Sequence, residues 1–178
     1  MKIDDAQRDM RRGYLHGGPG VLASSLVWLA AGAVALTRTS DASIATLFIG
    51  GMFIHPLAVL ISKALRAPGR HSSGNPLGTL AMETTIPMLL ALPLVYAVSR
   101  LNIAWFFPAM LFVIGPRYLS FATMYGMRLY WVFGAALAAA GYALFASGAS
   151  FATGAFTGAG IELLFAAIIL VGARRTAN

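Results

Sequence analysis

Six long, mainly apolar runs dominate the chain, and only short polar connections separate them. The runs cover approximately residues 18–36, 43–65, 77–98, 103–124, 127–146 and 151–171. A helix needs about 20 apolar residues to cross the hydrocarbon core of a bilayer, and each run is close to that length. Because the runs are continuous rather than alternating, they do not indicate a membrane β-barrel. The sequence therefore predicts an all-α membrane protein, a six-transmembrane-helix bundle in a single integral membrane domain over residues 1–178.

The balance of charged and apolar residues supports this class. Of the 178 residues, 58% are hydrophobic and 11% are charged, whereas soluble domains carry about 25% charged residues. The net charge is +7. Because the cations lie between apolar runs, we expect anionic lipid headgroups as partners and no nucleic acid. The chain has no cysteine and only three histidines, so neither a metal centre nor another cofactor is predicted.

The first 16 residues precede the first run and have a different pattern. Ile3, Ala6, Met10 and Tyr14 recur at helical spacing. The opposite face carries charged residues, namely Asp4, Asp5, Arg8, Arg11 and Arg12. This pattern predicts a short amphipathic helix that lies on the membrane surface and leads into the first span.

The placement of Lys and Arg predicts how the chain is threaded through the membrane. If the N-terminus is cytoplasmic, only Arg38 and Arg100 of the 13 Lys and Arg residues fall on the opposite side. This asymmetry predicts a multi-pass protein of the bacterial inner membrane with both termini in the cytoplasm. Aromatic residues such as Trp28, Tyr118 and Tyr130 are expected at the membrane interfaces.

Two of the runs resemble each other. A shift of 107 residues aligns "SDASIATLFIGGMFIHPL" with "SGASFATGAFTGAGIELL", and eight of the 18 positions are identical. Three parallel helical hairpins would explain such a repeat. The Ala, Gly and Ser content of both segments raises the number of chance matches, so the repeat is a hypothesis.

Four ionisable residues fall in the middle or the cytoplasmic half of the predicted spans, away from the helix ends: His55, Glu83, Arg117 and Glu162. A charged group at the centre of a bilayer costs about 2.5–3.5 kcal/mol on insertion scales, so each of these residues needs a partner or water. One interpretation is a polar cavity open to the cytoplasm, in which Glu83 or Glu162 binds a proton or cation. His55 and Arg117 would then adjust the pKa of that carboxyl group. The alternative is structural, with a Glu83–Arg117 ion pair fixing helix packing and a neutral, hydrogen-bonded Glu162.

Prolines and small residues mark the helices that carry the two carboxylates. Pro87 leaves the carbonyl of Glu83 without its normal donor, which fits either a binding site at a broken helix or a plain kink. Gly154, Gly158 and Ala166 share a four-residue spacing with Glu162. Such a stripe is typical of close helix packing, and a homo-oligomer face is the alternative.

The longest connection, "RAPGRHSSGNP", is basic and ends at a predicted helix start. Asn75 is suited to cap that helix. The free backbone amides at this helix start, together with Arg66, Arg70 and His71, could hold a phosphate, a carboxylate or a lipid headgroup. A cytoplasmic loop that is basic only because of its location is the alternative.

Three stretches carry a resemblance to a known family: "RRGYLHGGPGVLASSLVWLAAG", "HPLAVLISKAL" with "GRHSSGNPLG", and "GPRYLSFATMYG". They resemble a family of small bacterial six-span inner-membrane proteins of unknown function. The resemblance covers nearly the whole chain and implies no activity, substrate or catalytic residue.

Three classes of function remain open at this point. A small transporter or channel is favoured by the ionisable residues beside prolines. A non-catalytic packing, assembly or sensor protein would use the same residues structurally. A membrane-embedded enzyme acting on a lipid is the weakest hypothesis, because the sequence shows no nucleophile–base pair and no metal-ligand set, and we therefore predict no catalytic residue.

Overall fold

The computed structural model describes residues 1–175 and confirms the six predicted spans. Within these residues, six helices are long and apolar enough to cross a membrane. The helices are α1 (Ile3–Tyr14), α2 (Gly18–Thr37), α3 (Ser40–Ala64), α4 (Leu77–Leu101), α5 (Phe106–Tyr125), α6 (Leu129–Ser147) and α7 (Phe151–Arg175). Short 3₁₀ turns, Leu15–Gly17 and Ile103–Trp105, precede α2 and α5. The last three residues of the predicted domain, 176–178, and hence the predicted cytoplasmic C-terminus, lie outside the described residues.

Short polar side chains and glycines set the helix boundaries. The Thr39 hydroxyl accepts a hydrogen bond from the Ala42 amide at the start of α3 (3.2 Å). Asn75 accepts one from the Leu77 amide at the start of α4 (3.0 Å), which confirms the predicted cap. Gly126 and Gly148 end α5 and α6 in the left-handed conformation that glycine adopts without strain.

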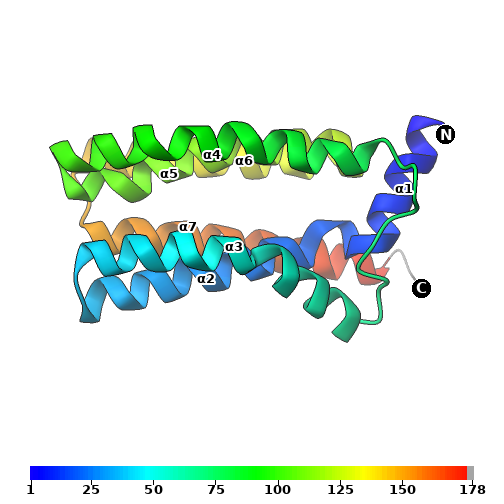
Figure 1. Ribbon diagram of the computed structural model, residues 1–178, viewed down its shortest axis with the longest axis horizontal. Coiled ribbons are helices and arrows are strands. Elements are labelled where there is room, and N and C mark those ends of the chain that lie inside the picture. Colours follow the sequence, from blue (N-terminus) through cyan, green and yellow to red (C-terminus); the bar gives the residue numbers. More distant parts are fainter. Residues whose placement is uncertain (176–178) are drawn as a thin grey trace.

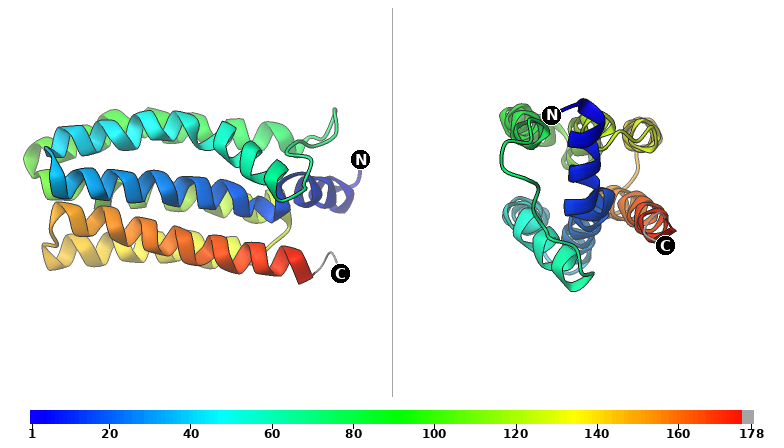
Figure 2. Two further views of the ribbon diagram at one scale, coloured as in Figure 1. Left: turned by 90° about the horizontal axis from the view of Figure 1, so that it is seen from below. Right: turned by 90° about the vertical axis from the view of Figure 1, so that its right-hand side faces the viewer.

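The six long helices form two layers of three (Figures 1 and 2). In one layer α2 packs against both α3 and α7, and in the other α5 packs against both α4 and α6. The predicted hairpins α2–α3 and α4–α5 are therefore packed pairs. The third hairpin is only a connection, because α6 packs chiefly on α5 and α7 chiefly on α2. The three-helix layer, and not the hairpin, is the packing unit of the bundle.

Aromatic side chains join the layers at the end far from α1. The ring centroids of Trp28 and Phe107 lie 5.5 Å apart, and those of Phe48 and Phe106 lie 5.7 Å apart. Phe151 at the start of α7 packs on Phe107 at 4.7 Å. Each of these pairs joins a helix of one layer to α5 of the other, so this end of the bundle is filled by rings.

Helix α1 lies across the opposite end of the bundle, between the two layers (Figure 2). The predicted amphipathic pattern is confirmed, since Ala6 and Met10 are buried. The apolar face, however, packs on the bundle and not only on a membrane surface. The Gln7 side-chain amide donates to the Thr123 carbonyl (2.7 Å), and the Gly69 amide donates to the Gly13 carbonyl (2.9 Å). α1 therefore ties α5 to the connection between α3 and α4.

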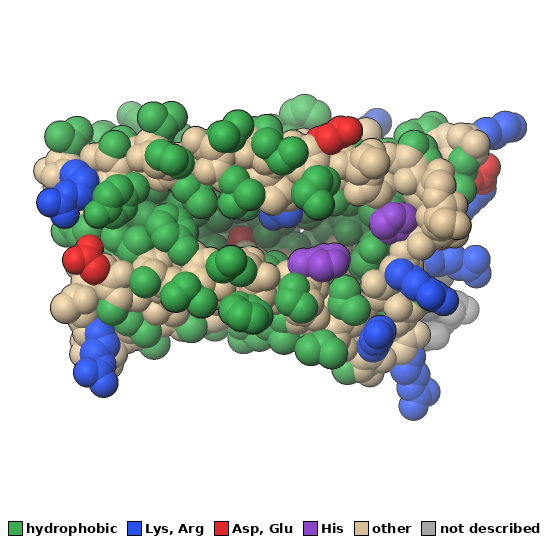
Figure 3. All heavy atoms as spheres, in the orientation of Figure 1, with side chains coloured by type: hydrophobic (Ala, Val, Ile, Leu, Met, Phe, Trp, Pro, Cys, Tyr) green, Lys and Arg blue, Asp and Glu red, His purple; other side chains and the backbone are tan. Residues whose placement is uncertain are grey.

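One side of the bundle is less closely packed than the rest. α3 and α4 belong to different layers and hardly touch. α3 contains Pro56, and its second half bends away from the α4 layer (Figure 1). Figure 3 looks onto this side and shows a hollow between the two helices, with charged side chains inside it. The same figure shows basic side chains gathered at the end that carries α1.

Candidate functional site

Glu162 is the most deeply buried acidic or basic side chain of the described spans, with 1% of its surface exposed. It lies eleven residues after Phe151, the first residue of α7, which places it about 17 Å along that helix. The small residues that share its stripe, Gly154, Gly158 and Ala166, are also buried. Gly158 lies against the Trp28 ring of α2. Small residues on this face let α2 approach α7 closely, and the approach encloses the carboxyl group.

Tyr118 of α5 holds one oxygen of this carboxyl group. Its hydroxyl donates to Glu162 Oε1 (3.0 Å). The tyrosine ring is fixed by Phe133, whose centroid lies 4.0 Å away, and it is 3% exposed. The second oxygen, Oε2, is buried without a hydrogen-bond partner. Ser24 of α2 lies beside the carboxyl group, but its hydroxyl does not reach hydrogen-bonding geometry with Oε2.

Arg117 precedes Tyr118 on α5 and brings a positive charge to the same region. Its Nη2 donates to the Thr85 hydroxyl of α4 (3.3 Å), and its guanidinium lies over the Phe121 ring at 5.2 Å. Its charge interacts with both Tyr118 and Glu162. Its Nε is buried and has no hydrogen-bond partner. A buried donor and a buried acceptor, each unsatisfied, thus occur in one polar cluster.

Glu83 does not join this cluster. Each helix residue turns the chain by about 100°, which puts Glu83 on the other side of α4 from the buried residues Leu77, Val95 and Ser99. Its side chain is accordingly exposed. Within residues 1–175 it forms no ion pair with Arg117, because the single ion pair there joins Arg8 to Asp5. The charge of Arg117 thus interacts with Glu162 without forming an ion pair with it, and Glu83 lies on the outer surface.

His55 borders the hollow between α3 and α4. It is exposed, and it follows Phe48 by two turns on the same side of α3. Phe48 points toward the other layer, because its ring packs on Phe106 of α5. Of the four predicted residues, Arg117 and Glu162 lie inside the bundle, His55 lies at the hollow, and Glu83 faces outward. Their roles in binding a ligand stay predictions.

The basic connection between α3 and α4 already holds an anionic group of the chain itself. Asp9 of α1 accepts hydrogen bonds from the Ser72 amide (2.9 Å), the Ser72 hydroxyl (2.8 Å) and the Asn75 side-chain amide (2.8 Å). The bonds from Asn75 and then from Ser72 lower the pKa of Asp9. His71 pairs with the Tyr14 hydroxyl (2.9 Å), while Arg66 and Arg70 are exposed. Ser72 and Asn75 are thus occupied by an internal carboxylate.

Two partners of the buried cluster were not anticipated from the sequence. Trp28, Tyr118 and Tyr130 were expected at the membrane interfaces, and all three are buried inside the bundle. Their depth in a membrane stays a prediction. Thr85 was not singled out at all. The place of Tyr118 next to Arg117 gave no signal, because residues adjacent on a helix point about 100° apart.

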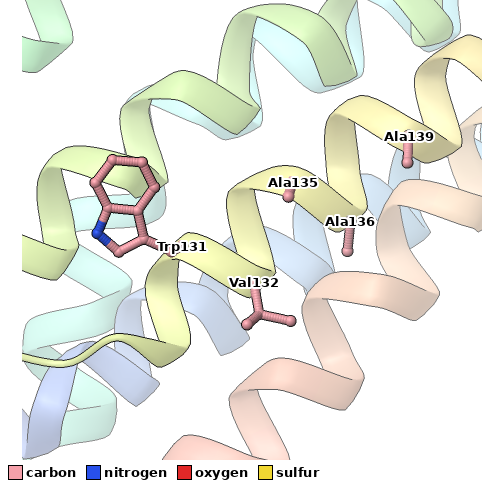
Figure 4. A pocket seen from close by; sticks show the side chains of 5 residues that line it. All are labelled: Trp131, Val132, Ala135, Ala136 and Ala139. Atoms are coloured by element: carbon pink, nitrogen blue, oxygen red, sulfur yellow. The ribbon is translucent and has the colours of Figure 1, made fainter.

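An apolar groove runs along the outer surface of α6 (Figure 4). Its lining consists of Trp131, Val132, Ala135, Ala136 and Ala139. It offers no charged group and therefore no chemistry beyond contact with apolar chains. No three His, Asp or Glu side chains gather into a metal-ligand set anywhere in residues 1–175.

Comparison with known proteins identifies a family but no activity. Neither the curated proteins nor the solved structures include one that matches this chain. The family described as "family of unknown function (DUF7010)" matches residues 3–172, nearly the whole chain. The resemblance seen in the sequence is thereby confirmed, and the chain belongs to this family of unknown function.

Proposed function

We propose that this protein is a small membrane transporter whose central binding group is Glu162, assisted by Tyr118 and Arg117. The observation that carries the proposal is a carboxyl group that is 1% exposed, lies midway along a membrane-spanning helix, and keeps one oxygen without a partner. Buried polar groups in native proteins are nearly always satisfied, so an unsatisfied one calls for a proton, an ion, water or a ligand.

The neighbourhood of Glu162 favours ligand binding over a purely structural network. A structural network would be expected to satisfy all of its members, because each unsatisfied buried group costs about 1–3 kcal/mol. Here Glu162 Oε2 and Arg117 Nε both lack partners. A small polar ligand or a proton at this place would complete the hydrogen bonds that the protein leaves open.

The charges of the site suggest coupling to protons. The ionisable groups that face Glu162 are Tyr118 and Arg117 of α5, and α2 contributes the neutral Ser24. One cation and one carboxylate balance each other. An anion that binds Arg117 would leave a net negative charge in a poorly hydrated interior, and uptake of a proton by Glu162 removes it. Binding of an anion is then linked to protonation of Glu162.

We further propose that the end carrying α1 faces the cytoplasm of a bacterial cell. The support is the positive-inside rule together with the basic residues gathered at this end. The chain has no cysteine, so a single introduced cysteine is the one thiol of the protein that a maleimide can label. A membrane-impermeant maleimide added to intact spheroplasts should label Thr39→Cys and spare Ser73→Cys until the cells are opened. The reverse pattern contradicts the proposed orientation.

Transport itself is tested in proteoliposomes that contain a pH-sensitive dye. Wild-type protein, Glu162→Gln and the matched outer-surface variant Glu83→Gln are each exposed to a panel of small carboxylates, phosphates and inorganic anions. We expect at least one solute to acidify or alkalinise the lumen with wild type and Glu83→Gln, and not with Glu162→Gln. Absence of any solute-dependent signal, or an equal signal from Glu162→Gln, overturns the proposal.

A second candidate, an assembly function, is favoured by Glu83. Its side chain is exposed on the outer surface of α4, among the exposed apolar residues Met82 and Ile86. A carboxylate that faces lipid is costly, and a helix of a second copy or of another protein would give it a partner. Native mass spectrometry from mild detergent should then show a complex that Glu83→Leu dissociates. A monomer in both cases removes this candidate.

A further inference from the structure

We infer that the ligand of the Glu162–Arg117 site is an amphiphile with one apolar chain and a single anionic head, which enters sideways from the bilayer between α3 and α4. The inference rests on the proposed function, because it names the substrate class for the same site. It is carried by three observations: where the bundle is closed, where it is open, and which polar groups lie behind the opening.

Both ends of the bundle are closed. At the end far from α1, the rings of Trp28, Phe106 and Phe107 fill the space between the layers. At the other end, α1 is fastened across the bundle by the side chains of Gln7 and Arg11, which donate to carbonyls at the end of α5. A water-soluble ligand would have to displace one of these closures. A ligand from the bilayer would not.

The open side lies between α3 and α4. These helices hardly touch, and the surface between them is hollowed (Figure 3). Gly51 and His55, one turn apart on α3, are both exposed, and a Cβ atom added at Gly51 would meet no atom within 4 Å. The exposed apolar residue Met52 lies one turn before His55 on α3 and so borders this side. The opening is therefore apolar at its rim, as an acyl chain requires.

Behind this rim the available charge is positive. Arg117 is partly exposed, and it is bonded to Thr85 of α4, the helix that forms one edge of the opening. A guanidinium binds carboxylate and phosphate through two parallel N–H groups, and the Nε–H of Arg117 is free to be one of them. Glu162 lies deeper and is 1% exposed. The first charge that an incoming head meets is therefore Arg117, with His55 beside the path, so the site selects an anion.

The test uses wild-type protein in nanodiscs of zwitterionic lipid and measures the affinity of five probes. These are dodecanoate, dodecyl phosphate, dodecanol, dodecylamine and acetate, with binding followed by thermal unfolding and native mass spectrometry. We expect dodecanoate or dodecyl phosphate to bind at least about tenfold more tightly than dodecanol. Whichever of the two binds identifies the head as carboxylate or phosphate. Equal binding of dodecanol or dodecylamine, or binding of acetate alone, overturns the inference.

Two variants locate the binding. Arg117→Gln should weaken binding of the anionic amphiphile about tenfold, while Arg100→Gln, in the last turn of α4 at the opposite end, should not change it. Gly51→Phe should block the opening, and since a Cβ atom at this position meets nothing within 4 Å, the variant keeps the test decisive if Arg117→Gln does not fold. Unchanged affinity in a folded Gly51→Phe or Arg117→Gln variant contradicts lateral entry to this site.

The outcome separates this inference from the proposed function. If dodecanoate binds with the expected dependence on Arg117 but liposomes show no solute movement, the ligand class is correct and transport is wrong. If a small solute is moved in a Glu162-dependent way and no amphiphile binds, transport is correct and the ligand class is wrong.

Discussion

Helices α4 and α7 are nearly equivalent as sequences and very different as parts of the bundle. Each has 25 residues and contains one carboxylate, and the last turn is basic in both, with Arg100 in α4 and with Arg174 and Arg175 in α7. α7 packs along α2 and buries Glu162. α4 has only three buried residues, Leu77, Val95 and Ser99, and leaves Glu83 exposed.

The difference comes from the residues that surround each carboxylate on its own helix face. Glu162 shares its face with glycine and alanine, which allow a neighbouring backbone to come close. Around Glu83 the outer face carries Met82, Ile86 and Leu90, which are 66%, 51% and 72% exposed. A carboxylate in a membrane span therefore becomes an interior group only where its neighbours let another helix cover it.

The largest difference between the two helices is expected when each carboxylate is removed. We expect Glu162→Ala to lower the free energy of unfolding by about 3 kcal/mol, because it leaves the Tyr118 hydroxyl without an acceptor and empties the space that the buried side chain fills. Glu83→Ala should leave stability unchanged or raise it, since it removes a charge from an outer surface. Reversible unfolding in mixed dodecyl maltoside and SDS micelles measures both values.

Similar losses for the two variants would show that Glu83 has a structural partner, which in a purified sample means a second copy of the chain. Glu162→Gln is the control for hydrogen bonding, because its amide oxygen can still accept from Tyr118. It should restore part of the stability lost in Glu162→Ala.

The contrast between the two carboxylates also shows what the sequence could predict. The six spans, the amphipathic α1, the Asn75 cap and the stripe around Glu162 follow from local periodicity and turn chemistry, and all are present. The layer arrangement did not follow, because α6 and α7 are adjacent in sequence yet pack on different partners. The same limit applies to the site. Arg117 could reach Glu83 or Glu162 by depth alone, and only the rotation of α4, which depends on tertiary packing, decides between them.

The close approach of α2 to α7 can be tested at glycine. A side chain at Gly158 would begin 2.5 Å from Trp28 Cε3, whereas one at Gly160 would meet nothing within 4 Å. We expect Gly158→Leu to destabilise the bundle by about 2 kcal/mol through overpacking. Gly160→Leu should have no such effect, and since glycine disfavours helix it should stabilise slightly. The same micelle titration measures both variants, and equal effects would contradict the packing of α7 on α2.

A smaller effect is expected for the hydrogen bond that Tyr118 makes to Glu162. Tyr118→Phe should cost about 1 kcal/mol, because the carboxyl group loses its one protein donor within hydrogen-bonding distance. Tyr142 of α6 is 67% exposed and supplies the matched control, since Tyr142→Phe removes a hydroxyl that faces outward. Retention of full stability in Tyr118→Phe would mean that water or another group bonds to the carboxyl group of Glu162. The site would then be less shielded from water than its burial implies.

The smallest effect concerns Asp9, a carboxylate that is neither buried like Glu162 nor without partners like Glu83. Hydrogen bonds from Asn75 and Ser72 lower its pKa below the ordinary value of 3.8. A carboxyl group whose pKa is lower in the folded state stabilises that state above the unfolded pKa, and this contribution is lost as the pH falls through the folded pKa. The attachment of α1 to the connection between α3 and α4 should therefore be constant at neutral pH and weaken below about pH 4. Because Asp9 is largely solvated, Asp9→Asn should cost no more than about 0.5 kcal/mol.

Hydrogen exchange of the α1 amides should rise in Asp9→Asn and stay unchanged in Asp4→Asn, whose side chain is exposed. Equal exchange in the two variants would mean that Asp9 does not help to hold α1 across the end of the bundle, and that the remaining contacts of α1, including those of Ala6 and Met10, hold it there.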